Sequence, residues 1–214
     1  RLARRARVGN DVSVLDVCCG IAGPGRLITA EFGCRYLGVD YSASTVEIAR
    51  DLAGDVPCRF VEALVPPLPD GRFEVVLLLE TMLAFPDKHT LVADVASVLE
   101  PGGRFAFTVE EGRPLTPVEQ ELMPDADTVW LVELADLTTL LGGVGLTVTW
   151  QEDCTAPHRE VAAALLRSFE SDGPAIERAI GERPLADLIG AHRLWTEWLG
   201  NGRVRKFAMV AEKR

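Results

Sequence analysis

The sequence predicts an α/β fold in which a doubly wound, largely parallel sheet has helices on both faces. Three observations predict it. Short apolar runs alternate with helical stretches along most of the chain. The run at residues 14–18 carries an acidic residue, passes into a glycine-rich turn and enters a helix. The run at residues 73–79 is apolar on both faces, as a parallel strand buried between helices should be.

The other elements follow from periodicity and from turn and capping residues. We expect strands near residues 12–18, 35–39, 58–61, 73–79, 103–109, 146–152 and 203–211. Helices are expected at residues 23–32, after a capping pattern at Ser44–Glu47, at 88–99 and around 133–142. Residues 111–129 are predicted as a loop or short helix. The last strand alternates apolar and charged residues, which predicts a sheet that is less fully buried there.

A long helical segment separates the last two predicted strands. About 50 residues lie there, where the fold needs only a hairpin. We therefore expect a single domain over residues 1–214, with residues 154–200 as an insertion that covers the substrate. The alternative is a helical layer that only adds stability.

Composition limits the kinds of partner. The 214 residues carry a formal charge of −10, which argues against nucleic acids and anionic membranes and favours a small neutral or cationic substrate. No apolar run is long enough to span a membrane, and no secretory signal is visible. Five cysteines without CxxC spacing indicate reduced thiols in a cytoplasm. Only about ten residues precede the first strand, and a homodimer is left open.

Three motifs together resemble a known family. They are the loop from Val14 to Arg26, Asp40 at the end of a strand-like run, and the segment Leu99–Arg104 between a helix and a strand. Over roughly residues 11–110 the chain resembles the class I S-adenosylmethionine (SAM) dependent methyltransferases, in particular bacterial enzymes that act on small molecules. The resemblance implies the strand order 3-2-1-4-5-7-6 with the last strand antiparallel. It also implies SAM as cofactor and S-adenosylhomocysteine as product.

The resemblance assigns the first loop to the methionine end of SAM. The family pattern D-x-G-x-G-x-G falls on Asp16, Cys18, Gly20 and Ala22. Cysteine and alanine replace two glycines, which puts individual contacts in doubt, but both residues are small and the loop should still admit the ligand. A nicotinamide-binding loop needs GxGxxG, and the glycine spacing here is wrong for it.

Further cofactor residues follow from the same resemblance. Asp40 should accept hydrogen bonds from both ribose hydroxyls; alternatively it is a solvated turn aspartate that caps the next helix. Tyr41 is expected to flank the adenine. Glu62 and Ala63 take the position that contacts adenine N6 and N1. Glu80 ends the fourth strand beside the expected sulfonium.

Catalysis needs alignment more than it needs a base, because the methyl group of a sulfonium is already activated. His192 lies on an apolar helical face of the insertion and is a candidate base, with hydrogen-bonded packing as the alternative. His158, near the start of the insertion, and Glu80 are further candidates, and Glu110 and Glu111 are alternative bases. Cys154 and His158 alone do not make a zinc site.

The predicted function is methyl transfer from SAM to a small molecule, with a specialised metabolite favoured. The sequence does not reveal the acceptor or whether O, N or C is methylated. A SAM-binding protein with cyclase-like chemistry, or with structural use of the cofactor, is the alternative. A non-catalytic interaction domain is a third class, in which the loop and Asp40 would be superfluous.

Overall fold

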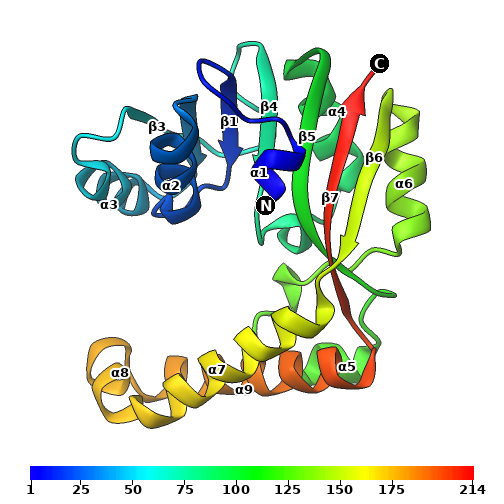
Figure 1. The fold of residues 1–214 in the computed structure, drawn as a ribbon. Coiled ribbons are helices and arrows are strands. Elements are labelled where there is room, and N and C mark those ends of the chain that lie inside the picture. The colour runs from blue at the N-terminus through cyan, green and yellow to red at the C-terminus, as the bar shows by residue number, and fades with distance from the viewer. The chain divides into compact units, whose positions relative to one another are not determined.

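The computed structural model describes all of residues 1–214 and contains a seven-stranded sheet. Its order is β3-β2-β1-β4-β5-β7-β6, and β7 is antiparallel (Figure 1), which confirms the predicted topology. The strands are β1 (Ser13–Val17), β2 (Arg35–Asp40), β3 (Cys58–Glu62), β4 (Phe73–Leu78), β5 (Leu99–Glu111), β6 (Leu146–Asp153) and β7 (Arg205–Lys213).

The strand register determines where a ligand can bind. Val17 of β1 pairs with Val39 of β2 on one side and with Leu78 of β4 on the other. These three parallel strands therefore end level with one another, and the loops that follow them leave from one edge of the sheet. In doubly wound sheets this carboxyl edge is the ligand-binding edge.

Nine α-helices and two short 3₁₀ helices connect the strands. The helices are α1 (Leu2–Arg5), α2 (Gly23–Phe32), α3 (Ala43–Ala53), α4 (Lys88–Val98), α5 (Pro117–Leu122), α6 (Leu134–Gly143), α7 (Thr155–Ser171), α8 (Gly173–Ile180) and α9 (Glu182–Asn201), with η1 (Met82–Ala84) and η2 (Ala126–Thr128). The predicted helical segment between the last two strands is thus confirmed as three helices, α7 to α9. None of the helices combines the length and the apolar character that a membrane crossing requires.

Two local predictions are wrong. The capping pattern at Ser44 and Glu47 does not begin α3, because the hydroxyl of Ser42 accepts the hydrogen bond from the Thr45 amide. Ser42 comes sooner after β2, and its extended backbone suits an N-cap. β5 begins at Leu99 instead of near residue 103, so the segment Leu99–Arg104, expected to connect a helix to the strand, is the irregular start of the strand.

The last strand is more buried than predicted. Residues 206–211 of β7 are all buried, because this strand lies between β5 and β6 in the sheet. The charge of Lys206 fits there because its Nζ is ion-paired with Glu110. β7 can therefore be buried because it has a neighbouring strand on each side and because Lys206 has an ion-pair partner.

The chain folds into two compact units. The first consists of residues 1–109, 135–151 and 208–214, and the second of residues 110–134 and 152–207. Whether they act as the single domain expected from the sequence stays a prediction.

The core of the first unit has a layer on each side of the sheet. On the side of α1, α2 and α3, small and apolar residues of these helices pack against alternate strand residues such as Val14, Tyr36 and Phe60. Residues of the opposite parity, including the stacked rings of Phe105 and Phe107, are equally buried. Figure 1 shows α4 behind the sheet and α1 in front of it.

The second unit is built on the antiparallel contact between α7 and α9. The ring of Phe169 on α7 meets the ring of His192 on α9 with centroids 4.8 Å apart. Arg203, which follows α9, forms a two-pronged ion pair with Glu119 of α5, with nitrogen–oxygen distances of 2.6 and 2.9 Å. These contacts join the helices of this unit to one another.

Candidate functional site

The loop between β1 and α2 has an unusual backbone. Cys18, Gly20 and Ala22 all have left-handed backbones, with φ angles of 57°, 54° and 55°. These are the positions at which the sequence pattern predicts glycines, because only glycine takes this conformation without a steric penalty. Each non-glycine residue here costs on the order of 1–2 kcal/mol. Cysteine and alanine therefore keep the shape of a glycine loop at some cost in stability.

Asp16 supports this loop from inside the protein. Its side chain is only 3% exposed, and Oδ2 accepts a hydrogen bond of 2.6 Å from the hydroxyl of Tyr36. Burial raises the pKa of the Asp16 carboxyl to about 7, although the Tyr36 hydrogen bond works in the opposite direction. Gly25 leaves room for Tyr36, since a Cβ there would lie 2.1 Å from the tyrosine oxygen. The predicted contact of Asp16 with the cofactor stays a prediction.

Asp40 connects the loop to the end of β2. Its Oδ2 accepts the amide of Gly20 at 2.9 Å, and its Oδ1 accepts the amide of Ser42 at 3.1 Å. A carboxylate has about four acceptor positions, so both oxygens can accept further hydrogen bonds. The alternative of a solvated helix-capping aspartate does not describe this residue, because Asp40 is buried and Ser42 caps α3. Asp40 thus ties the loop to the end of β2 at the carboxyl edge, and its contact with the ribose stays a prediction.

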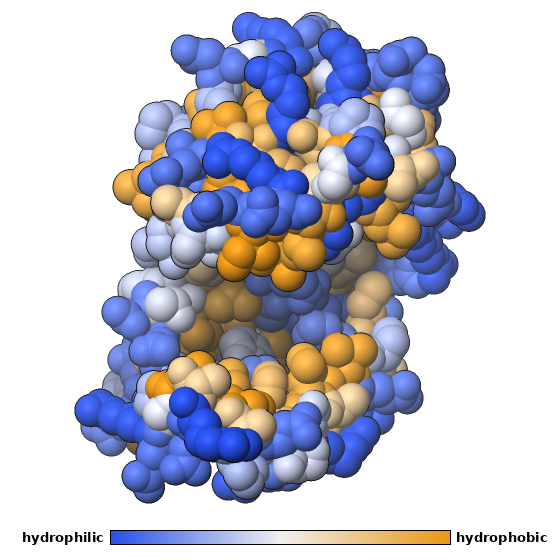
Figure 2. Space-filling view, turned by 90° about the vertical axis from the view of Figure 1, so that its left-hand side faces the viewer, coloured by the Kyte–Doolittle hydropathy of each residue, from blue (hydrophilic) through white to orange (hydrophobic).

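Exposed apolar side chains lie in the loops that leave this edge. Tyr41 after β2 is 71% exposed, Leu64 after β3 is 77% exposed, and Ile21 after β1 is 49% exposed. Figure 2, which views the molecule from the left-hand side of Figure 1, shows apolar surface among the hydrophilic residues. Such residues can cover an aromatic ligand. Tyr41 was predicted from the sequence, whereas Ile21 and Leu64 were not; their signal is an apolar residue in a loop just after a strand.

Glu62 and Ala63 lie at the end of β3, directly beside Asp40. Glu62 is exposed and pairs with Asp40 in the register of β2 and β3. The amide of Ala63 donates a hydrogen bond of 2.9 Å to the carbonyl of Asp40. The structure therefore brings the three residues of the predicted ribose and adenine contacts together.

Glu80 leaves β4 at the same edge. It is exposed and has a left-handed backbone, with φ 62°. Thr108 of β5 holds it twice: the threonine Oγ1 accepts the Glu80 amide at 2.7 Å and donates to Glu80 Oε1 at 2.9 Å. Strained backbone of this kind is often found at functional sites. Thr108 was missed because its partner lies in another strand, far away in the sequence.

Cys18 is not equipped for nucleophilic chemistry. Burial, followed by the nearby carboxylates, raises the pKa of its thiol to about 12, so the thiol stays neutral near pH 7. Its contribution to the loop is its small size.

His192 has partners within the second unit. Its Nδ1 lies 2.8 Å from the carbonyl oxygen of Leu188, and its ring packs on Phe169. In the neutral ring, this hydrogen bond places the proton on Nδ1 and leaves Nε2 as an acceptor. These contacts fit the packing role, and the unprotonated Nε2 fits the role of a base.

Glu110 and Lys206 form a buried ion pair in the second unit. Glu110 is 6% exposed and Lys206 is 2% exposed, and the lysine Nζ donates to Glu110 Oε1. The Nε2 or Nδ1 atom of His158 lies within 4.8 Å of a carboxylate oxygen of Glu110. The neighbouring pair, Glu111 and Arg205, is more exposed, with a distance of 2.9 Å. Glu110 and His158 were predicted from the sequence as candidate catalytic residues, whereas Lys206 was not.

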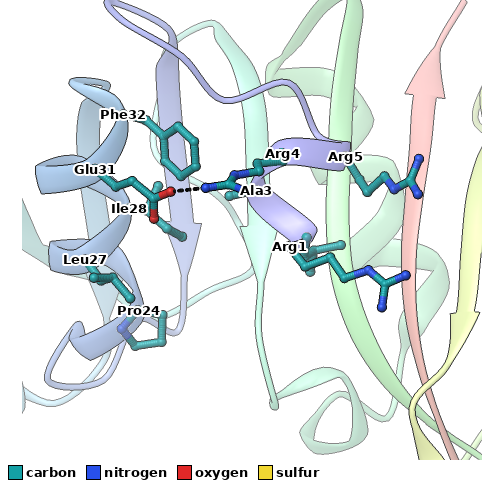
Figure 3. Close-up of a pocket in the computed structure, with 10 residues that line it drawn as sticks. Arg1, Ala3, Arg4, Arg5, Pro24, Leu27, Ile28, Glu31 and Phe32 are labelled. Atoms are coloured by element: carbon teal, nitrogen blue, oxygen red, sulfur yellow. Dashed lines mark hydrogen bonds and ion pairs between the residues drawn. The ribbon is translucent and has the colours of Figure 1, made fainter.

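A pocket of about 540 Å³ lies between α1 and α2 of the first unit. Figure 3 shows α2 side chains on one side and α1 on the other, with an ion pair of 2.6 Å between Arg4 and Glu31. It is lined by Arg1, Leu2, Ala3, Arg4, Arg5, Pro24, Leu27, Ile28, Glu31 and Phe32. Pro24 lies in the first turn of α2, so the pocket adjoins the loop described above. The sequence did not predict this pocket, because helical patterns do not show where two helices leave space.

The chain is similar to known methyltransferases. A family model described as a methyltransferase domain matches residues 15–107. The chloroplastic tocopherol O-methyltransferase of Arabidopsis thaliana is 32% identical over 117 residues, which are 52% of this chain and 34% of that protein. The chain thus spans about a third of the length of the tocopherol methyltransferases that it matches.

Solved structures share the fold. A cyclopropane synthase from Mycobacterium tuberculosis has a TM-score of 0.89 at 12% identity, over 99% of this chain and 81% of that one. Phosphoethanolamine N-methyltransferase 2 of Haemonchus contortus, solved with S-adenosyl-L-methionine, has a TM-score of 0.83 at 18% identity, over 99% and 51%. At such identities the likeness shows the architecture alone.

Proposed function

We propose that this chain is a class I SAM-dependent methyltransferase and that it transfers a methyl group from SAM to a small-molecule acceptor by direct displacement. The observation that carries the proposal is the left-handed loop from Cys18 to Ala22, tied by Asp40 to the carboxyl edge of the sheet. A non-catalytic interaction domain would have no need for this arrangement.

The residues at this edge fit the parts of SAM. The remaining acceptor positions of Asp40 suit the two ribose hydroxyls. Glu62 and Ala63 would contact the adenine edge, and the exposed side chains of Tyr41 and Leu64 would cover its faces. The loop of Cys18, Gly20 and Ala22 would lie along the methionine end, with Asp16 as its buried support.

Bound SAM supplies a methyl group on a sulfonium, so the chain has to align the acceptor and exclude water. Such alignment can contribute roughly 7–11 kcal/mol. We assign this work to Glu80, His158 and His192 as polar groups that orient the acceptor. We assign the covering role to residues 154–200, because an insertion of that length exceeds what a hairpin needs.

The acceptor is proposed to be a specialised metabolite, neutral or cationic, in keeping with a chain charge of −10. The tocopherol O-methyltransferase among the relatives, whose name gives a small organic acceptor, supports this class. A cytoplasmic location and a homodimer stay predictions.

Two measurements test the proposal. Methyl-labelled SAM is incubated with the chain and a metabolite extract, and the labelled product is identified by mass spectrometry. Transfer of label that is lost in Asp40→Ala supports the proposal. Heat stabilisation by SAM without transfer of label would favour cyclase-like chemistry or structural use of the cofactor. Without either stabilisation or transfer, the chain would be an interaction domain.

A further inference from the structure

The pocket between α1 and α2 has an apolar wall. Its volume of about 540 Å³ lies within the range of about 300–1,000 Å³ that is usual for small-molecule sites. Figure 3 shows the apolar side chains of α2 directed toward α1, namely Pro24, Leu27, Ile28 and Phe32. Leu27 is 66% exposed, although exposed helix positions usually carry polar side chains. α2 therefore presents an apolar face that α1 covers only in part.

The charged residues of this pocket are mostly positive. Arg1, Arg4 and Arg5 line it together with a single acidic residue, Glu31, in a chain whose formal charge is −10. Arg4 and Glu31 form an ion pair of 2.6 Å and balance each other. The positive charge in excess belongs to Arg1 and Arg5. The pocket therefore attracts an anion, in contrast to the chain as a whole.

Arg5 is held in a position to bind an anion. Its guanidinium lies over the ring of Trp150 in β6, 5.4 Å from the ring centroid, and forms no side-chain hydrogen bond or ion pair. A guanidinium that contacts a ring through its face keeps the N–H groups in its plane available for a carboxylate. Trp150 and all residues that line the pocket belong to the first unit.

We infer that this pocket binds a free amphiphile of the fatty-acid type, with one carboxylate and an unbranched apolar chain. The chain lies against the apolar face of α2, and the carboxylate accepts hydrogen bonds from Arg5. A single charge fits better than a phosphate group, because Glu31 also lines the pocket and repels a second negative charge. Neither SAM binding nor methyl transfer is needed for this site.

Decanoate is the first probe, and two molecules with the same chain length test the headgroup. They are 1-decanol, which is neutral, and decyltrimethylammonium, which is cationic. Calorimetric titration of the 214-residue chain, below the concentrations at which micelles form, measures each affinity. Decanoate should bind about tenfold more tightly than 1-decanol, the ratio expected from a hydrogen bond to a charged group. Decyltrimethylammonium should not bind, because the arginines repel it.

Two variants test the two parts of the site. Arg5→Gln should weaken the binding of decanoate about tenfold and leave that of 1-decanol unchanged. Leu27→Asp should weaken the binding of both, because it places a charge on the apolar wall. Arg7→Gln and Leu52→Asp make the same changes at exposed positions outside the pocket and should behave as wild type. Thermal unfolding confirms that each variant is folded.

Fluorescence locates the bound probe. Trp150 is the only tryptophan of the first unit, and the other three tryptophans belong to the second. The bromine of 2-bromodecanoate lies next to the carboxylate and quenches a tryptophan that is close to it. Quenching should be strong in the wild-type chain and largely lost in Trp150→Phe.

Several results would overturn the inference. These are equal decanoate affinity in Arg5→Gln and Arg7→Gln, or quenching that persists in Trp150→Phe. Competition between decanoate and SAM would place the probe at the carboxyl edge instead. If Arg5→Gln does not fold, the probes decide with wild-type protein, because equal binding of decanoate and 1-decanol contradicts a carboxylate site.

Two other occupants have their own signatures. Binding to phosphatidylglycerol vesicles without binding of decanoate would identify a membrane surface. A dimer that Leu27→Asp abolishes, again without binding of decanoate, would identify a second copy of the chain. Either result overturns the inference. Failure of SAM binding or of label transfer overturns the proposed function and leaves the decanoate result unaffected.

Discussion

The hydroxyl of Tyr36 donates a hydrogen bond of 2.6 Å to the carboxylate of Asp16, beneath the loop that we assign to SAM. This contact exists because Gly25 has no side chain, so that the tyrosine ring can lie against the start of α2. Gly25, Tyr36 and Asp16 thus form a continuous support from α2 through β2 to β1.

Gly25→Ala should therefore destabilise the protein. Its Cβ would lie 2.1 Å from the Tyr36 oxygen, so the ring must move and Asp16 loses its partner. We expect the free energy of unfolding to fall by about 2–4 kcal/mol, from overpacking and a lost hydrogen bond. Gly23→Ala is the control, since nothing lies within 4 Å of its added Cβ. Urea denaturation that gives equal values for both variants would contradict this account.

Asp16 should make stability fall as the pH rises. Burial raises the pKa of its carboxyl from 3.8 to about 7 in the folded protein. Between about pH 4 and pH 7 the folded state holds a proton that the unfolded state has released, so the free energy of unfolding decreases across this window. Asp16→Asn has no titrating group there and should flatten the curve. Parallel stability curves for the two proteins would show that Asp16 titrates normally.

Asp40→Ala should weaken SAM binding by roughly 1.5–3 kcal/mol, the range for hydrogen bonds to a charged group. The variant also leaves the amides of Gly20 and Ser42 without their acceptor, so stability should fall as well. Calorimetric titration measures the affinity, and urea denaturation measures the stability. Asp55→Ala, at an exposed aspartate, is the control. Unchanged affinity in Asp40→Ala would move the ribose contact elsewhere.

Glu119 should stabilise the second unit at neutral pH. Its hydrogen bonds to Arg203 lower the pKa of the Glu119 carboxyl from 4.5 to about 2. Its stabilising effect is complete above about pH 4.5 and is lost as the pH falls toward 2. Glu119→Gln should cost about 2 kcal/mol at pH 7. Glu31→Gln, which breaks the exposed pair with Arg4, should cost less than about 1 kcal/mol. A larger loss in Glu31→Gln would reverse our ranking of the two pairs.

His192→Gln should lower stability, because the ring loses its contact with Phe169 and its hydrogen bond to Leu188. Turnover per folded molecule separates the two roles of this histidine. If His192 is a base, turnover falls by about 10²–10⁴-fold while SAM affinity is kept. If it only packs, turnover stays near wild type. Thermal unfolding supplies the folded fraction for this comparison.

The fold could be predicted because its signals are local. A loop that needs left-handed residues shows small side chains at alternate positions, even where cysteine and alanine replace glycine, as at Cys18 and Ala22. The sequence pattern predicted Ser44 as the N-cap of α3, whereas the observed N-cap is Ser42. Both serines fit the pattern, and the position at which β2 ends decides between them.

The site was harder to predict because its supports join distant segments. Thr108 meets Glu80 across two strands, and Lys206 meets Glu110 from the far side of the helical insertion. Contacts between such distant residues leave no periodic pattern in the sequence. The alternating charges of β7 are typical of a strand with one solvent-exposed face. The ion pair between Lys206 and Glu110 explains how the strand can be buried instead.

The position of β7 has a consequence for how the molecule assembles. β7 follows β5 and β6 in the chain but lies between them in the sheet, so those two strands have no partner on their inner edges until β7 arrives. During synthesis, α7 to α9 leave the ribosome before that gap can close. Unpaired strand edges invite pairing with other chains, so the interval before β7 emerges is when the nascent protein is most prone to aggregate.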